Sequence, residues 1–153
     1  MNHIWYIHPY AGSPRNGMSF RPYYMAKHFN SSGYHSTIIS SENHHLSKFE
    51  GASIGLNNIE NVDFYLIKTN KYHGNGLYRV LNMLRFGKNL FRRDFKKFAS
   101  VSPPSVIIAS SAHPFHIFAA KYYAKKYNAK LIIEVRDLWP LSLIELDRKS
   151  TRL

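Results

Sequence analysis

Short apolar segments alternate with longer segments of helical spacing along the chain. Segments that are nearly continuous in apolar residues are typical of strands buried on both faces of a sheet. They occur at Ile4–Ile7, Thr37–Ile39, Val62–Ile67, Val106–Ala109 and Leu131–Val135. The spacing between them predicts helices at Arg21–Asn30, Leu77–Ala99 and Pro114–Tyr127. Because strands and helices alternate, we expect an α/β fold of three layers, with helices on both faces of a mainly parallel sheet.

Two segments depart from this alternation. The long helical segment contains Gly87, where we expect the helix to break. The segment Ser41–Asn61 is polar and irregular, which predicts an exposed loop instead of a further element. We expect His44 and His45, which lie in this loop, to be in solvent.

The segment Asp147–Leu153 is similar to the in-frame translation of a common short-read sequencing adapter. The alternative interpretation is an ordinary basic helix end. We treat the segment as a non-native tail, which leaves residues 1–146 as the natural domain. A chain of 153 residues, 44% of them apolar, can build one core, and a second domain does not fit.

The chain is strongly basic, with a formal net charge of +12. This charge predicts attraction to nucleic acid, phosphorylated substrates or an anionic lipid leaflet. The chain has no cysteine, which excludes disulfides and thiolate metal sites. The N-terminus lacks the pattern of a signal peptide, and no segment is apolar enough to span a membrane.

Candidate site residues follow three of the predicted strands. Ligands of open parallel sheets bind beyond the carboxyl ends of the strands, so these loops are expected to converge. They supply Gly12, Arg15, Gly17 and Arg21 after the first strand, His113 after the fourth, and Arg136 and Asp137 after the fifth. We expect the glycines and arginines to bind substrate.

The first loop has the glycine spacing of a P-loop at Gly12 and Gly17, but Met18 stands where that motif requires lysine. The G-x-G-x-x-G fingerprint of dinucleotide sites is also missing. The loop could therefore approach an anionic ligand through its backbone, or it could be an ordinary turn.

His113 could donate a hydrogen bond to a sugar hydroxyl or a phosphate, or it could be a helix cap. His113 and His116 have a possible metal-ligand spacing, but no third ligand is evident, so we expect no metal. Asp137 could serve the site or cap a helix that begins near Pro140.

The helical segment Leu77–Ala99 is rich in cations. A helical wheel places most of them beside an expected core stripe of Leu77, Leu81, Leu84, Phe91, Phe95 and Phe98. Phe86 and Leu90 lie away from this stripe, which suits a helix at a membrane interface. The membrane-facing cations would then be Arg85, Arg92, Arg93, Lys96 and Lys97. The alternative is a core-packed helix with a solvated basic face.

The run Glu134-Val135-Arg136-Asp137-Leu138-Trp139-Pro140 resembles a motif of glycosyltransferase family 4, as found in bacterial enzymes of O-antigen and capsule synthesis. The turn Ser110–Pro114 is similar to the corresponding turn of that family. In the first loop, relatives often show two glycines where this chain has Ser19 and Phe20. The resemblance covers nearly all of residues 1–146.

This resemblance implies a Rossmann-like domain that forms the N-terminal, acceptor-side half of a GT-B fold, with the C-terminal nucleotide-sugar domain absent. It implies a retaining transferase that needs no metal or cofactor and uses a nucleotide sugar as donor. It also implies that His113 and Asp137 take part in catalysis, His113 by contacting the donor sugar and Asp137 by lining the acceptor side. Gly17 and Arg21 would close over the cleft. The acceptor would be a lipid-linked glycan, at the cytoplasmic face of the bacterial membrane.

Two alternatives remain at this stage. One is a stand-alone basic α/β module that binds a polyanion such as nucleic acid, although no nucleic-acid-binding motif occurs and we expect no such partner. The other is a nucleotide-sugar epimerase, which shares the two-domain architecture. Under the transferase hypothesis, this chain alone is expected to be inactive, because both substrates must be held between two domains.

Overall fold

The computed structural model describes residues 2–17, 19–44, 47–49, 51–71, 77–111 and 113–136. The proposed tail and Asp137 lie outside these residues. The helices are α1 (Arg21–Ser31), α2 (Leu77–Asn89), α3 (Arg93–Val101) and α4 (Ile117–Tyr127). The strands are β1 (His3–Ile7), β2 (His35–Ser41), β3 (Asn43–His44), β4 (Ser47–Lys48), β5 (Gly55–Ile59), β6 (Val62–Ile67), β7 (Val106–Ser111) and β8 (Lys130–Val135).

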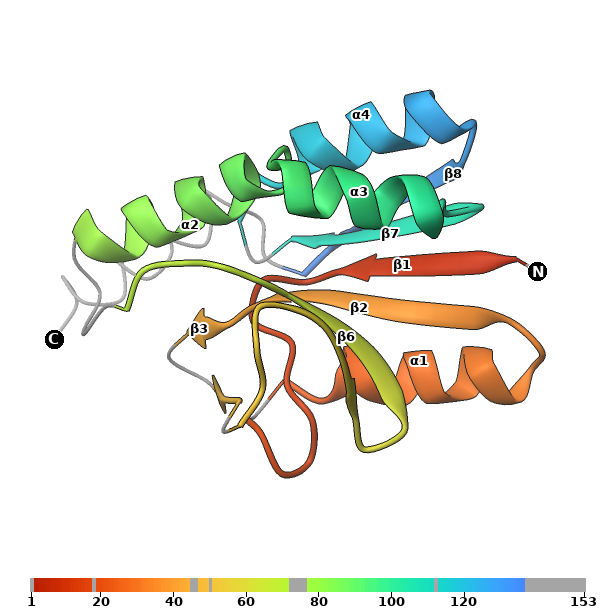
Figure 1. Cartoon of the computed structure of the whole chain (residues 1–153), viewed down its shortest axis with the longest axis horizontal. Coiled ribbons are helices and arrows are strands. Elements are labelled where there is room, and N and C mark those ends of the chain that lie inside the picture. Colours follow the sequence, from red (N-terminus) through yellow and green to blue (C-terminus); the bar gives the residue numbers. More distant parts are fainter. Residues whose placement is uncertain are drawn as a thin grey trace, which may run out of the picture.

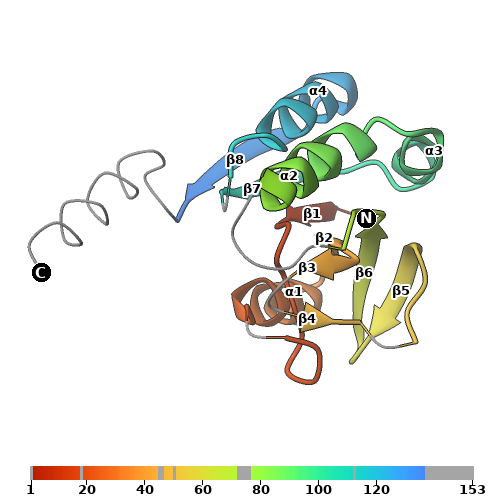
Figure 2. The same cartoon turned by 90° about the vertical axis from the view of Figure 1, so that its left-hand side faces the viewer.

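Six strands form one sheet in the order β5-β6-β2-β1-β7-β8. All neighbours pair in parallel except β5, which is antiparallel to β6. Helix α1 covers one face, and α2, α3 and α4 cover the other (Figures 1 and 2). The mainly parallel, three-layer α/β fold is therefore confirmed. From β1 the chain builds one half of the sheet through β2 and β6 and the other through β7 and β8, so the strand order reverses between β1 and β7, as in doubly wound folds.

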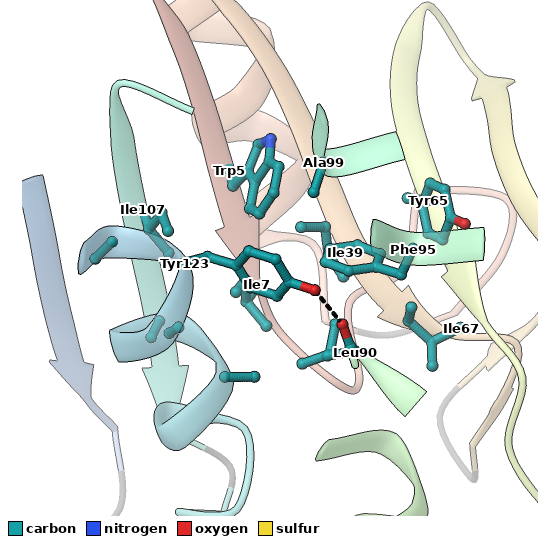
Figure 3. Close-up of a cluster of buried hydrophobic side chains, with 14 of the residues drawn as sticks. Trp5, Ile7, Ile39, Tyr65, Ile67, Leu90, Phe95, Ala99, Ile107 and Tyr123 are labelled. Atoms are coloured by element: carbon teal, nitrogen blue, oxygen red, sulfur yellow. Dashed lines mark hydrogen bonds between the residues drawn. The ribbon is translucent and has the colours of Figure 1, made fainter. Parts of the chain in front are cut away.

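The core beneath α3 and α4 is built around Trp5 (Figure 3). This indole is fully buried, and the ring centroids of Phe95 and Tyr123 lie 5.4 and 5.6 Å from it at steep angles. The Tyr123 hydroxyl donates a hydrogen bond of 2.6 Å to the carbonyl of Leu90. Edge-to-face aromatic packing and a satisfied buried hydroxyl both stabilise such a core.

The predicted break in the long helical segment is confirmed, but its predicted position at Gly87 was wrong. Helix α2 continues through Gly87 to Asn89, and α3 begins at Arg93. A Cβ atom on Gly87 would lie 2.9 Å from the carbonyl oxygen of Phe115. The glycine therefore allows the chain before α4 to approach α2 closely, and the break comes later, beside the buried Leu90.

The predicted orientation of α2 was also wrong. Phe86 and Leu90, expected at the surface, are fully buried, whereas Leu77 is 72% exposed. Leu81 and Leu84 of the expected core stripe are exposed as well. The helical wheel treated α2 and α3 as one continuous helix. The buried face marked by the phenylalanines of α3 was therefore extended to the wrong face of α2.

The segment Ser41–Asn61, expected to be a loop, contains the hairpin of β3 and β4 and the edge strand β5. Strands β5 and β6 are joined at Glu60 and Asn61, both at positive φ (50° and 66°), as in a type I′ turn. The expectation for His44 was wrong as well, since this side chain is buried and one ring nitrogen lies 3.3 Å from the carbonyl oxygen of Ala11. His45 lies outside the described residues.

Candidate functional site at the carboxyl edge of the sheet

The loops that follow β1, β7 and β8 meet at the carboxyl edge of the sheet. Tyr10 follows β1, and its ring centroid lies 6.1 Å from that of His113, which follows β7. Arg136 follows β8 and contacts His8, which follows β1. These residues lie where the strand order reverses between β1 and β7, which is the usual ligand-binding position in open α/β sheets.

His113 is a buried side chain that makes no hydrogen bond within the described part of the chain. It is 2% exposed, and neither ring nitrogen has a hydrogen-bonding partner there. Burial, followed by the neighbouring His116, His8 and Arg79, lowers the pKa of His113 to about 3. The ring is therefore neutral near pH 7 and offers one donor and one acceptor. Because a buried, unpaired polar group costs about 1–3 kcal/mol, the geometry favours a bound partner at this position.

His116 lies beside His113, with the ring centroids 5.0 Å apart. It is fully buried, and burial lowers its pKa to about 4 against an opposing interaction with the backbone of Ser110. The phenyl ring of Phe86 contacts both imidazoles edge-on. The two histidines are thus neutral rings in a largely apolar setting, which suits hydrogen bonding to a neutral polar ligand.

His8 and Arg136 form the most unusual contact of the site. Arg136 Nη1 lies 2.8 Å from His8 Nε2, while the amide of Tyr10 donates to His8 Nδ1 at 3.1 Å. A neutral imidazole has only one acceptor nitrogen, so one tautomer cannot accept from both donors. With Nδ1 accepting from Tyr10, the Nε2–H group and the guanidinium are two donors that converge. An oxygen of an anionic ligand that accepted from both would resolve this conflict.

The imidazole ring of His8 is neutral in this site. Burial, and then the charge of Arg136, lower the pKa of His8 to about 3. The ring is 2% exposed and stays neutral near pH 7. Arg136 is itself exposed, and its Nη1 also lies 3.4 Å from Ser19 Oγ, so the first loop contributes a further polar group beside it.

Glu134 connects the first loop to the last described strand. Its carboxylate accepts 2.7 Å and 2.6 Å hydrogen bonds from Arg21 Nε and the Tyr6 hydroxyl. Burial raises the pKa of Glu134, but the hydrogen bonds from Tyr6 and Arg21 act against burial, and the pKa lies below its usual value. Burial and the bond to Glu134 raise the pKa of Tyr6 to about 12. Arg21, expected to bind substrate, is thus anchored through Nε beside the site.

The glycines of the first loop have a structural explanation. A Cβ atom on Gly12 would lie 2.6 Å from the carbonyl oxygen of Asn16. Gly17 has a φ of 128°, which side-chain-bearing residues rarely adopt. Arg15 has an ion pair outside the histidine cluster, because its Nε lies 3.8 Å from the carboxylate of Glu60 in the β5–β6 turn. Of the residues predicted in this loop, Arg21 alone is linked by the hydrogen bonds above to the β8 side of the site.

Three residues of the site were missed from the sequence: His8, Tyr10 and Glu134. His8 and Tyr10 lie directly after the first apolar segment, where polar residues indicate a strand's carboxyl end. Glu134 interrupts the apolar pattern of the last segment, which was the available signal. The five predicted membrane-facing cations lie elsewhere, on or beside α2 and α3, and all are exposed.

Among the described residues, no three His, Cys, Asp or Glu side chains lie so that they could hold a metal ion. None of the described helices is both long and apolar enough to cross a membrane. A scan against protein-family models and a search of curated proteins find no match to this chain. The fold and the geometry thus define a doubly wound α/β domain with a candidate ligand site where the strand order reverses.

Proposed function

We propose that this chain is the N-terminal, acceptor-side domain of a retaining glycosyltransferase with a GT-B fold. Such an enzyme moves a sugar from a nucleotide sugar to a lipid-linked glycan during surface polysaccharide synthesis. The observation that carries the proposal is the burial of His113 at the switch point of the sheet, where neither ring nitrogen has a hydrogen-bonding partner among the described residues. The resemblance of the run from Glu134 to Pro140 to glycosyltransferase family 4 supports the same conclusion.

In this proposal the described residues bind and orient the substrates. Neutral His113 exchanges hydrogen bonds with a sugar hydroxyl, because it offers one donor and one acceptor in a site shielded from water. Arg136 and the Nε2–H group of His8 donate to oxygens of the donor diphosphate. Donors fixed before the reaction stabilise the negative charge that develops on a leaving group. The partner domain supplies the remaining contacts to the diphosphate.

We also propose that the enzyme acts at the surface of the bacterial cytoplasmic membrane. Arg85, Arg92, Arg93, Lys96 and Lys97 are all exposed, as this requires. The exposed apolar side chains of α2 are Leu77, Leu81 and Leu84. We propose that they contact the membrane in place of Phe86 and Leu90, which are buried. An exposed apolar helix face next to cations favours an anionic leaflet.

The test is sugar transfer by the complete reading frame that contains this chain. The assay measures nucleoside diphosphate released from a panel of nucleotide sugars in the presence of membranes that carry lipid-linked acceptors. We expect His113→Ala to lower turnover by at least about tenfold, as loss of one buried hydrogen bond to the substrate predicts. The matched control is His28→Ala, since His28 is exposed on α1.

Circular dichroism would verify that both variants remain folded. Release of nucleoside diphosphate by none of the donors would refute the proposal. So would a His113→Ala enzyme that keeps the full activity of the His28→Ala control.

A further inference from the structure

Two hollows adjoin at the junction of α2 and α3, away from the histidines. The first, of about 210 Å³, lies between β6 and α3 and is lined in part by Ile54, Tyr65, Ile67 and Phe95. The second, of about 540 Å³, lies along α2 and has Leu81 and Leu84 in its wall. Asn89 and Arg92 line both hollows, so the two hollows are adjacent, and we call them together the junction groove.

The junction groove has a cationic middle. Arg85 and Lys88 line the second hollow, Lys68 lines the first, and Arg92 lines both. All four side chains belong to exposed residues. Asp94 is the one carboxylate among the lining residues of the two hollows. The excess of positive charge therefore favours an anionic group where the two hollows meet.

The two arms of the groove are largely apolar. Tyr65, Ile67 and Phe95 belong to the buried core and form a fixed wall in the first hollow. Ile54, at its edge, is 48% exposed. Covering Ile54 with another apolar group is favourable, because it removes the exposed surface of this side chain from water. A ligand that fits this distribution has an anionic head and an apolar chain.

We propose that the junction groove binds one anionic membrane phospholipid, with its phosphate at Arg92 and Lys88 and the first part of an acyl chain in the hollow beneath Ile54. None of the residues lining the groove belongs to the histidine site. Four of them, Leu81, Leu84, Arg85 and Arg92, also belong to the membrane-facing surface, so the inference rests on and deepens that part of the proposed function. Binding of a single lipid in a groove also differs from attraction of a basic surface to a leaflet, because it saturates at one lipid per chain.

The experiment is calorimetric titration of the full chain with dihexanoyl phosphatidic acid below its critical micelle concentration. We expect one-to-one binding. Lys88→Gln/Arg92→Gln should weaken it by roughly tenfold or more, as two cations near a phosphate predict. The matched control is Lys96→Gln/Lys97→Gln, which removes the same charge from exposed residues of α3 that do not line the groove. This control should change the affinity less than about twofold.

A second pair of variants tests the apolar arm. Ile54→Asn should weaken binding severalfold, whereas Leu56→Asn should not, because Leu56 is similarly exposed but does not line the groove. Inorganic phosphate should bind at least about tenfold more weakly than the lipid, since it has no chain to bury. Equal losses in the two double variants, equal affinity for phosphate, or no saturable binding would each overturn the proposal.

Discussion

Arg21 Nε donates a 2.7 Å hydrogen bond to Glu134 Oε1, and this contact ties the first residue of α1 to β8. The other carboxylate oxygen accepts from Tyr6 of β1, so β1, α1 and the distant strand β8 meet at one side chain. The carboxylate thereby fixes the position of the first loop relative to the strand that precedes Arg136.

The first prediction concerns this carboxylate. Glu134→Gln should lower the free energy of unfolding by about 1–2 kcal/mol, because an amide oxygen can replace one acceptor but the NH₂ group faces the other donor. Arg21→Met should cost less than Glu134→Gln, since the Arg21 side chain is 58% exposed and its ion pair is screened by water. Urea unfolding of both variants measures the difference. An Arg21→Met cost equal to that of Glu134→Gln would contradict the assigned roles.

The second prediction concerns Gly87. Alanine normally favours a helix interior over glycine by about 1 kcal/mol. Gly87→Ala should nevertheless destabilise the chain by roughly 1–3 kcal/mol, because the new Cβ atom would lie 2.9 Å from the carbonyl oxygen of Phe115 and must push α2 away. Thermal unfolding provides the measurement. The exposed neighbour Lys88→Ala is the control and should be nearly neutral; a stabilised Gly87→Ala chain would show that the close approach is absent.

The third prediction concerns pH. His3, His8, His113 and His116 have pKa values lowered to about 3–4 in the folded chain, mainly by burial. In the unfolded chain these rings bind protons near pH 6.5. Between about pH 4 and 6.5 the unfolded state therefore binds more protons, so stability must fall as pH falls through this window. Each histidine contributes up to about 1.4 kcal/mol per pH unit.

Denaturant unfolding at several pH values between 4.5 and 7.5 tests this expectation. His113→Gln should reduce the slope of stability against pH by about one proton, whereas His28→Gln, at an exposed position, should leave the slope unchanged. The folded carboxylate of Glu134 has a lowered pKa and acts in the same direction at lower pH. Stability that is flat between pH 4.5 and 6.5 would mean that the buried histidines are not neutral in the fold.

The fourth prediction concerns β8, the edge strand beside β7. Ile132, Ile133 and Val135 are each about half exposed on this strand. Exposed apolar edge strands pair readily with other chains. We expect the chain to associate at high concentration and Ile133→Lys to reduce this association, as measured by sedimentation velocity. Ile54→Lys, at a similarly exposed residue outside the strands, is the control and should have little effect on association. If Ile54→Lys and Ile133→Lys reduced association equally, exposed apolar surface in general, and not β8, would be its cause.

The parallel strands could be predicted from the sequence because their apolar runs record burial on both faces. Strand β5 could not, because it lies at the sheet edge and its sequence, Gly-Leu-Asn-Asn-Ile, is mostly polar. The faces of α2 and α3 were confused because apolar spacing shows that a helix has a buried side, but not where one helix ends and another begins.

The candidate site was predictable in part. Its location followed from the polar residues after the apolar segments, and the structure does bring the loops after β1, β7 and β8 together. The contact between His8 and Arg136 was not predictable, since these residues are 128 positions apart and their pairing depends on the strand order. The burial of His113 likewise depends on Phe86 and Tyr10, which only the fold brings beside it.

The buried position of Trp5 makes it an intrinsic fluorescence probe of the core. The sequence has two tryptophans, and the second is Trp139. With Trp139 replaced by phenylalanine, all indole fluorescence would come from a ring that is fully buried among Phe95, Phe98 and Tyr123. Emission from such a ring is at short wavelength and shifts to longer wavelength when water reaches it. A ligand that loosened or tightened the packing of α3 and α4 on the sheet could therefore be followed without any attached dye.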